Sequence, residues 1–173
     1  GGIFAVNTGS AITGTGTVRV SGGTTTFSGA NTGTANLAVT GGTATFSGNT
    51  TTTGGGTFSG GTFNGAGTLT LGAPLTLSGT TLGGTGVLNA NAGATISSNF
   101  SFNGGQTLNL SGASTWSAGY IYAGASSILT NKVGATLTTN FNGTLHGTYY
   151  GGGAATTVFN NQGTFIKTAG VTD

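Results

Sequence analysis

The feature that most limits the fold of this chain is an internal repeat of about 20 residues. The segment GGTTTFSG at 22–29 returns as GGTATFSG at 41–48, so Phe27 is followed by Phe46 at an offset of 19. Farther along, a Gly-Ala pair recurs at intervals of 19 to 22 residues. Identity at a constant offset is typical of proteins that stack one small unit on the next. The pairs begin at positions 72, 93, 112, 134 and 153.

The composition indicates that each unit consists of strands. Glycine accounts for 38 of the 173 residues, threonine is about as common, and Pro74 is the only proline. Glycine and β-branched residues disfavour helices and favour short strands broken by turns. Collagen would need glycine at every third position and abundant proline, so it is excluded. We expect short strands at 68–71, 87–90, 107–110 and 127–131.

Units of this size cannot bury an apolar face alone, so they stack into a solenoid. We expect an all-β fold, a single-domain parallel β-helix over residues 1–173, with about eight coils of roughly 19–22 residues and no substantial helix. A β-sandwich or barrel remains the structural competitor, but it gives no reason for sequence identity at a constant offset. Because the chain starts at Gly1 without a methionine, we expect a processed product or a piece of a longer protein.

Alternation within the strands predicts the core. In TLTL the side chains of Leu69 and Leu71 share the inner face, and the intervening threonines face outward. The segment 54–67 is more closely spaced, and the spacing assigns it no register. GATISSNF at 93–100 returns as GATLTTNF at 134–141, which predicts that the two segments occupy equivalent positions two turns apart. The equivalent pairs would be Ile96 with Leu137, Phe100 with Phe141, all four buried, and Asn99 with Asn140 at corners.

The charge pattern excludes several classes of partner. Charged residues make up 2% of the chain, and the net charge of +2 comes from three scattered basic residues. Binding of nucleic acid requires clustered lysine and arginine, so no nucleic-acid partner is expected. There is no cysteine, and no apolar run approaches the length of a membrane-spanning helix, so neither disulfides nor membrane insertion is expected. The basic residues are Arg19, Lys132 and Lys167.

Four strings in the chain resemble the degenerate repeats of secreted bacterial parallel β-helix proteins, namely autotransporter passengers and filamentous-haemagglutinin-like adhesins. The likeness covers nearly the whole chain and is one of composition and period. It implies an exported, extracellular or cell-surface protein that serves as a stalk, an adhesin or a surface fibre. The strings are GTGTVRVSGG (14–23), GAGTLTLGAPLTLSG (65–79), GGTGVLNANAGATI (83–96) and FNNQGTFIKTAG (159–170).

Catalysis is not expected. Asp173 is the only carboxylate side chain, whereas glycoside hydrolysis needs a pair of carboxylates and calcium needs several oxygen ligands. His146 is the only imidazole, and without a carboxylate to orient it a Ser-His-Asp mechanism cannot be assembled. We therefore interpret His146 as an ordinary surface or turn residue and expect no metal or other cofactor.

Threonine pairs offer one possible binding surface. On stacked strands, Thr-x-Thr pairs would form a flat ladder of hydroxyl and methyl groups like the faces of some ice-binding β-solenoids. The alternative is that threonine is simply a suitable neutral residue for an exposed strand. The pairs in register are Thr24 and Thr26 with Thr43 and Thr45.

Aromatic residues offer a second surface, which could contact a partner or stack on surface glycans. In the Gly-Ala alignment the inner slot of the intervening coil falls on Thr115, so Trp116 is out of step and would face solvent. The alternative is that a bulge restores the register and places Trp116 in the core. The candidate contact residues are Trp116, Tyr120, Tyr122, Tyr149 and Tyr150.

The ends of a parallel β-helix expose unpaired backbone unless they are capped, and exposed edges pair with other strands. We expect them to be occupied end to end by another copy, or by further coils of the parent chain. The expected function is a non-enzymatic, extracellular structural or adhesive rod or filament subunit of a bacterial surface. An ice-binding solenoid and a carbohydrate-binding adhesin are the alternatives.

Overall fold

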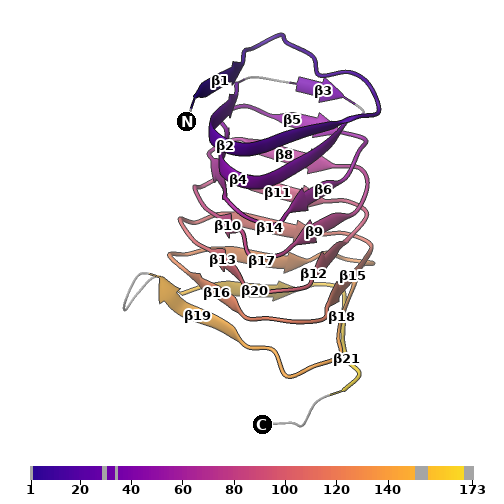
Figure 1. The fold of residues 1–173 in the computed structure, drawn as a ribbon. Coiled ribbons are helices and arrows are strands. Elements are labelled where there is room, and N and C mark those ends of the chain that lie inside the picture. The colour runs from indigo at the N-terminus through magenta and orange to yellow at the C-terminus, as the bar shows by residue number, and fades with distance from the viewer. Residues whose placement is uncertain (1, 29–30, 34, 151–155, 170–173) are drawn as a thin grey trace.

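The computed structural model describes residues 2–28, 31–33, 35–150 and 156–169. These residues form 21 strands and no helix, and every strand pairing among them is parallel. The strands wind around three faces of a rod, with the N-terminus and C-terminus at opposite ends (Figure 1). The chain is therefore a parallel β-solenoid, as the repeat predicts. The Gly-Ala pair at 153–154 and Asp173 lie outside the described residues.

Two long strands open the solenoid, and each runs along two faces. These are β2 (Thr17–Phe27) and β4 (Asn36–Phe46). The first half of β4 pairs with β6 (Gly56–Phe58) and its second half pairs with β7 (Thr62–Gly65). We call the side of the rod that contains β6 face 1, and the side that contains β7 face 2.

From β6 onward each turn places one strand on face 1, one on face 2 and one on face 3. Face 3 is a separate sheet of seven strands, so the described chain makes about seven turns, in agreement with the predicted coil number. Face 1 continues with β9 (Leu75–Leu77), β12 (Ala94–Ile96), β15 (Ala113–Trp116), β18 (Thr136–Thr139) and β21 (Thr164–Lys167). Face 2 contains β1 (Ile3–Val6), which precedes β2, and then β10 (Thr81–Leu82), β13 (Phe100–Phe102), β16 (Ile121–Gly124) and β19 (Leu145–Tyr150). Face 3 contains β3 (Asn31–Gly33), β5 (Thr50–Thr52), β8 (Thr68–Leu71), β11 (Val87–Ala90), β14 (Thr107–Leu110), β17 (Ile128–Asn131) and β20 (Val158–Asn161).

The segment 54–67 is an ordinary part of this winding. It supplies β6 and β7, and Gly56 of β6 pairs with Leu37 before it and Leu75 after it, each at an offset of 19. Gly56 occupies an interior position whose space is taken by leucines. A Cβ atom there would lie 2.7 Å from Leu71 Cδ1 and 2.9 Å from Leu75 Cδ1. The segment therefore keeps the register of the coils beside it, and glycine stands where those coils have a core leucine.

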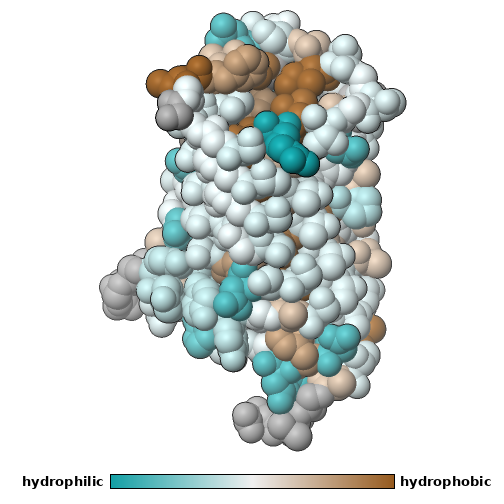
Figure 2. Space-filling view, in the orientation of Figure 1, coloured by the Kyte–Doolittle hydropathy of each residue, from teal (hydrophilic) through white to brown (hydrophobic). Residues whose placement is uncertain are grey.

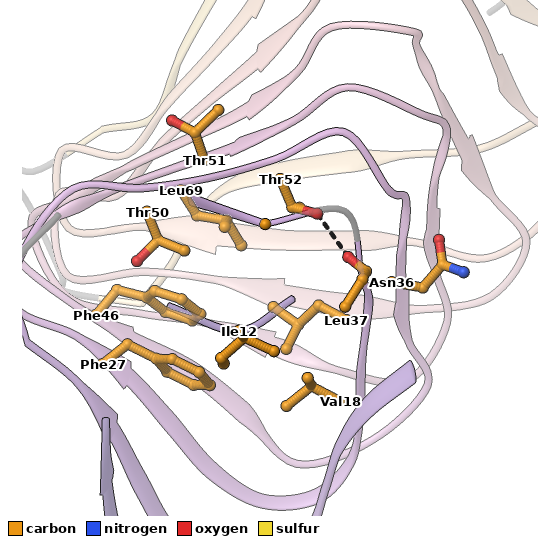
Figure 3. A pocket seen from close by; sticks show the side chains of 12 residues that line it. Ile12, Val18, Phe27, Asn36, Leu37, Phe46, Thr50, Thr51, Thr52 and Leu69 are labelled. Atoms are coloured by element: carbon orange, nitrogen blue, oxygen red, sulfur yellow. Dashed lines mark hydrogen bonds between the residues drawn. The ribbon is translucent and has the colours of Figure 1, made fainter. Parts of the chain in front are cut away.

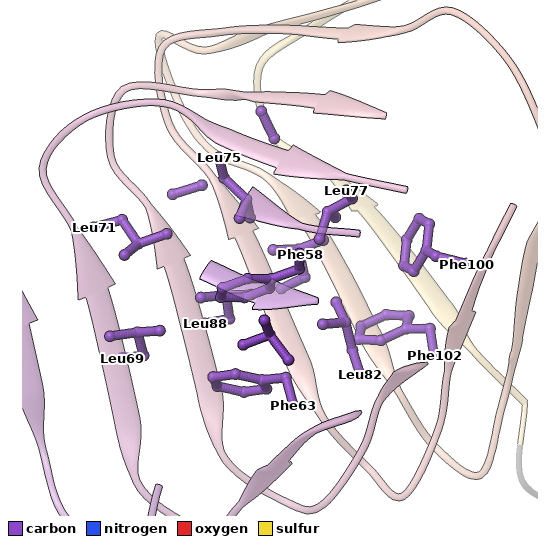
Figure 4. Packing of buried hydrophobic residues seen from close by; sticks show 14 of the residues in the cluster. Phe58, Phe63, Leu69, Leu71, Leu75, Leu77, Leu82, Leu88, Phe100 and Phe102 are labelled. Carbon is purple, nitrogen blue, oxygen red and sulfur yellow. The ribbon is translucent and has the colours of Figure 1, made fainter. Parts of the chain in front are cut away.

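Stacked side chains from the three faces fill the interior, as the alternation predicts (Figure 4). The leucines of TLTL are fully buried and the threonines between them are half-buried. On face 2 the phenyl ring of Phe27 stacks on Phe46 at a centroid distance of 4.5 Å, and Phe46 stacks on Phe63 at 5.0 Å. The offset of 19 read from the sequence thus places Phe27 directly over Phe46, as predicted. Another column, on face 3, consists of Leu69, Leu88, Leu108 and Leu129.

The structure corrects the register of the coil that contains Trp116. Ile96 pairs with Trp116 and Thr95 with Thr115, an offset of 20 where the Gly-Ala pairs suggest 19. Because a shift of one residue moves a strand's side chains to the opposite face, Trp116 points inward and is only 7% exposed. Ser114 takes the position expected for Ala113, and its Oγ accepts a hydrogen bond from the backbone N–H of Ala94 at 3.0 Å.

The predicted equivalence of residues 93–100 and 134–141 is also corrected. Ile96 pairs with Trp116, which in turn pairs with Thr139. Leu137 pairs with Ser114, so Ile96 and Leu137 lie two residues apart in register. An even shift preserves the side on which a residue lies, and both side chains are buried as predicted. Phe141 does not occupy the position of Phe100. It follows β18 and is partly buried with its ring edge-on to Trp116, and Asn99 and Asn140 are correspondingly not equivalent.

A small apolar pocket lies among the first coils (Figure 3). The rings of Phe27 and Phe46 line it together with Ile12, Val18 and Leu37. Ile12 and Val18 are only partly buried, because no further described coil covers them. The pocket is therefore the incompletely covered upper end of the core.

Candidate functional site: an aromatic cluster on face 2

Five rings gather on face 2 in the last described coils. The imidazole of His146 stacks on the ring of Tyr122 at 5.4 Å with an interplanar angle of 11°. The ring of Tyr149 approaches Tyr122 from another side at 4.6 Å. We call the group the aromatic cluster, and its members are Tyr120, Tyr122, His146, Tyr149 and Tyr150.

Strand register and one irregularity bring these rings together. Tyr122 of β16 and His146 of β19 are direct register partners, so their outward side chains stack along the axis. Beyond them the register shifts, and Gly124 pairs with Tyr150. The extra residues of β19 form a bulge, which places Tyr149 against Tyr122.

The cluster presents both apolar ring surface and polar groups. Tyr149 is 61% exposed and Tyr120 is 42% exposed, so both rings are available to a ligand. The hydroxyl of Tyr150 lies 2.8 Å from Ser101 Oγ in a hydrogen bond. The backbone N–H of Tyr120 donates to Asn99 Oδ1 at 2.7 Å, which fixes the start of this turn. Amphipathic rings of this kind are the usual anchors of recognition surfaces.

The structure brings together four of the five aromatic residues proposed from the sequence. Trp116 is the exception, because its ring packs inside the solenoid and cannot reach an external ligand. Sequence reasoning missed His146 as a cluster member, since it was judged by its lack of a catalytic partner. The sequence does indicate His146 through its position in GTLHGTYY, four residues before Tyr150.

The threonines proposed for an ice-binding face also lie on face 2. Thr24 pairs with Thr43 and Thr26 with Thr45, as predicted, and all four are half-buried. The second column ends after two coils, because the next position is Asn64. The first column continues into the aromatic cluster in the order Thr24, Thr43, Thr62, Thr81, Ser101, Tyr122 and His146.

A more regular array of hydroxyl groups lies on face 1 and was not recognised in the sequence. Its signal is a Thr-apolar-Ser triplet that begins at 57, 76, 95 and 115. The apolar residue of each triplet is buried, and the threonines form one outward column. The serines follow in step, since each donates its backbone N–H to a carbonyl of the coil before. The threonine column is Thr57, Thr76, Thr95, Thr115 and Thr138.

Charge is scarce over the surface. The visible side of the rod is mostly pale in Figure 2, with hydrophobic atoms gathered towards its upper end. Lys167 Nζ donates to Asn142 Oδ1 at 3.0 Å. The described strand residues on face 2 include no Lys, Arg, Asp or Glu, and Arg19 of β2 lies in the half of that strand on face 1. In the part of the chain that the structure describes, no three His, Cys, Asp or Glu side chains come together as metal ligands, and no helix is long and apolar enough to span a membrane.

The fold and these surfaces define the class of the molecule: it is a parallel β-solenoid repeat protein with a neutral, hydroxyl-rich exterior and one aromatic cluster. No family model matches the chain, and neither a curated protein nor a solved structure shows significant similarity to it.

Proposed function

We propose that this chain is a non-enzymatic, extracellular structural and adhesive rod of a bacterial surface, in the manner of autotransporter passengers and filamentous-haemagglutinin-like adhesins. The observation that carries the proposal is the aromatic cluster, which is the adhesive contact. Exposed tyrosine rings stand there on face 2, where the outward residues of the preceding strands β4, β7, β10 and β13 are threonine, serine and asparagine. Surface glycans are the partner, because a sugar has an apolar ring face that stacks on an aromatic ring and hydroxyl groups that hydrogen-bond beside it.

The rod supplies position and stiffness to that contact. Each strand of an inner coil pairs with the coil before and the coil after, so backbone hydrogen bonds run the length of the molecule. The chain has one carboxylate side chain, Asp173, and one imidazole. The rings that touch His146 are those of Tyr120 and Tyr122, which do not orient an imidazole as a general base. These observations favour a binding role over hydrolysis.

A glycan array tests the adhesive contact. The wild-type chain should retain neutral glycans, and Tyr149→Ala combined with Tyr120→Ala should lower the retained signal about tenfold or more through the lost stacking surface. Val133→Ala is the matched control, since Val133 is an exposed apolar residue outside the cluster. An array on which the wild type and the double variant bind the same glycans equally would refute the aromatic cluster as the contact.

The ends of the rod are proposed to be covered by another copy or by further coils of a parent chain. In the last described coil Phe159 and Phe165 continue the interior columns of Leu129 and Leu137, yet both rings are exposed. At the other end Ile3 and Phe4 are exposed. Apolar columns that end in solvent favour association along the axis.

Ice binding is a second candidate function, and the array on face 1 favours it. Hydroxyl groups repeat there at about 4.8 Å between coils and about 6.6 Å along each strand, and each threonine adds a methyl group, which makes a two-dimensional array. Thermal hysteresis of the freezing point measures this function directly. Thr95→Tyr, in the middle of the column, should abolish the hysteresis, whereas Thr107→Tyr on face 3 should preserve it. A wild-type protein without hysteresis would remove this candidate.

A further inference from the structure

We infer that the ligand of the aromatic cluster is an extended, neutral polysaccharide that lies along the solenoid axis on face 2. This inference rests on the proposed adhesive function and specifies the shape, charge and direction of its ligand. It follows from the register of face 2, which joins the cluster to a row of hydroxyl groups.

The row is built by one residue from each successive coil. Tyr122 pairs with Ser101, and Ser101 pairs with Thr81. Neighbouring coils are about 4.8 Å apart, so the five hydroxyl residues extend over about 19 Å parallel to the axis. We call this column the hydroxyl row, and it consists of Ser101, Thr81, Thr62, Thr43 and Thr24.

The cluster and the hydroxyl row meet at a hydrogen bond. Ser101 Oγ and the hydroxyl of Tyr150 lie 2.8 Å apart, so the polar edge of the cluster is also the first position of the row. All members of the row are half-buried, with their hydroxyl groups on the outer side of the sheet. A ligand that stacks on the exposed rings and continues over Ser101 would therefore meet one hydroxyl group per coil.

The chemistry of the row suits a polymer of sugars. A hydroxyl group both donates and accepts a hydrogen bond, which matches the hydroxyl groups that repeat along a polysaccharide. The row is long and narrow, so a linear chain makes more contacts with it than a single sugar does. The rings hold one end of that chain, and the row aligns the remainder.

The absence of charge on face 2 specifies a neutral ligand. Recognition of carboxylate or sulfate groups relies on arginine or lysine, and the described strand residues on face 2 include neither. An acidic polymer would lose hydration there without gaining an ionic partner. Within the described residues of face 2 the one basic side chain is that of His146, and its imidazole is covered by contacts with the rings of Tyr120 and Tyr122.

A peptide fits the same surface less well. Peptides that bind to sheets usually add a strand at a free edge. The strands beneath the row, β13, β10, β7, β4 and β2, already pair on both sides. A peptide would therefore add at the outer edge of β1 or β19, beyond the row, and would leave the hydroxyl row uncovered.

Calorimetric titration with oligosaccharides of increasing length tests the inference. The probes are β-1,4-linked glucose, β-1,4-linked N-acetylglucosamine and α-1,6-linked mannose oligomers, each from disaccharide to hexasaccharide, and oligogalacturonate as the acidic counterpart. For at least one neutral series the hexasaccharide should bind about tenfold or more tightly than the disaccharide, because it reaches the row. Oligogalacturonate should bind more weakly than the neutral series.

Two variants separate the row from the rings. Thr81→Val keeps a β-branched residue but removes one hydroxyl, so it should weaken the hexasaccharide severalfold and leave the disaccharide unchanged. Tyr149→Ala should weaken every length. The control is Thr107→Val, on the outer surface of face 3, where its register partner is already Val87.

The outcomes distinguish a failure of this inference from a failure of the proposed adhesive function on which it rests. Equal affinity for all lengths, or a Thr81→Val protein that binds the hexasaccharide like wild type, overturns the axial ligand and leaves a glycan-binding cluster in place. Tighter binding of oligogalacturonate overturns the neutral ligand. Failure of every neutral series, together with an empty glycan array, overturns the proposed function and this inference with it.

Discussion

The indole of Trp116 fills the interior slot on face 1 that Phe58, Leu77 and Ile96 fill in the three preceding coils. Its ring N–H donates to the carbonyl of Gly119 at 3.1 Å, so the one polar atom of the ring is paired. Its ring contacts Phe141 edge-on at a centroid distance of 5.6 Å. The largest side chain of the core thus lies where the coils begin to lengthen.

Replacing Trp116 with alanine should lower the free energy of unfolding by about 3–5 kcal/mol, since it leaves a large cavity between Ile96 and Thr139. Urea unfolding followed by far-ultraviolet circular dichroism measures the change. Tyr149→Ala should cost about 1 kcal/mol or less, because that ring is largely exposed. Equal effects of the two variants would show that the indole does not support the core.

A different sequence pattern predicts the register of Trp116 correctly. The coil offset is 20 both before and after the turn that precedes β15, but the Gly-Ala pair at 112–113 follows the pair at 93–94 by 19 residues. The pair has therefore moved by one residue within the turn, and an alignment on the pairs misplaces the strand. The threonine and the apolar residue of the Thr-apolar-Ser triplet are the last two residues of the strand, and they put Trp116 in step with Ile96. Residues buried on one face determine register more strongly than the loops that join them.

Turns between the faces depend on glycine only at particular places. Gly93 has a φ of +88°, and a Cβ atom there would collide with the backbone carbonyl of Ala113 in the next coil. Gly134 has a φ of +77°, but no atom lies within 4 Å of its would-be Cβ. Both belong to Gly-Ala pairs, yet only Gly93 is constrained by stacking as well as by its backbone conformation.

Gly134→Ala should therefore cost about 1–2 kcal/mol, which is the price of a left-handed alanine. Gly93→Ala should cost at least about 1–3 kcal/mol more, because a backbone atom of the next coil must also move. Thermal or urea unfolding of the two variants gives the comparison. If the two alanines destabilise equally, coil stacking at this turn is looser than described.

The strands of face 2 show why the candidate site could be predicted only in part. Tyr120 and Tyr122 are two residues apart, so their proximity is evident from the sequence. Their contact with Tyr149 and His146 depends on the pairing of β16 with β19, where the coil offset rises to 24 and then shifts at the bulge. A period read from the earlier coils does not extend to that pair.

At the scale of the whole molecule, the repeat predicted the solenoid, its approximate coil number and its inner and outer faces. The long strands of the first coils were not predicted, because β2 and β4 each combine into one strand what later coils divide into two. The ends also needed the structure, since only the register shows that Phe159 and Phe165 extend columns begun by Leu129 and Leu137.

Association along the axis should depend on those exposed rings. Light scattering of the folded chain should show an apparent mass that rises with concentration, and Phe165→Asp should return it to the monomer, because a charge on the end opposes stacking. Thr95→Asp introduces the same charge at an exposed position of β12, in the middle of face 1, and should leave association intact. A folded wild-type chain that stays monomeric at every concentration would exclude self-association.

The central claim is that the aromatic cluster on face 2 is the adhesive contact of a neutral rod. Chemical-shift mapping by nuclear magnetic resonance, with the neutral hexasaccharide that binds in calorimetry, tests it most directly. The largest changes should fall on Tyr120, Tyr149 and His146 and decrease along Ser101, Thr81 and Thr62. Changes concentrated on face 1, on face 3 or at the ends of the solenoid would contradict the account.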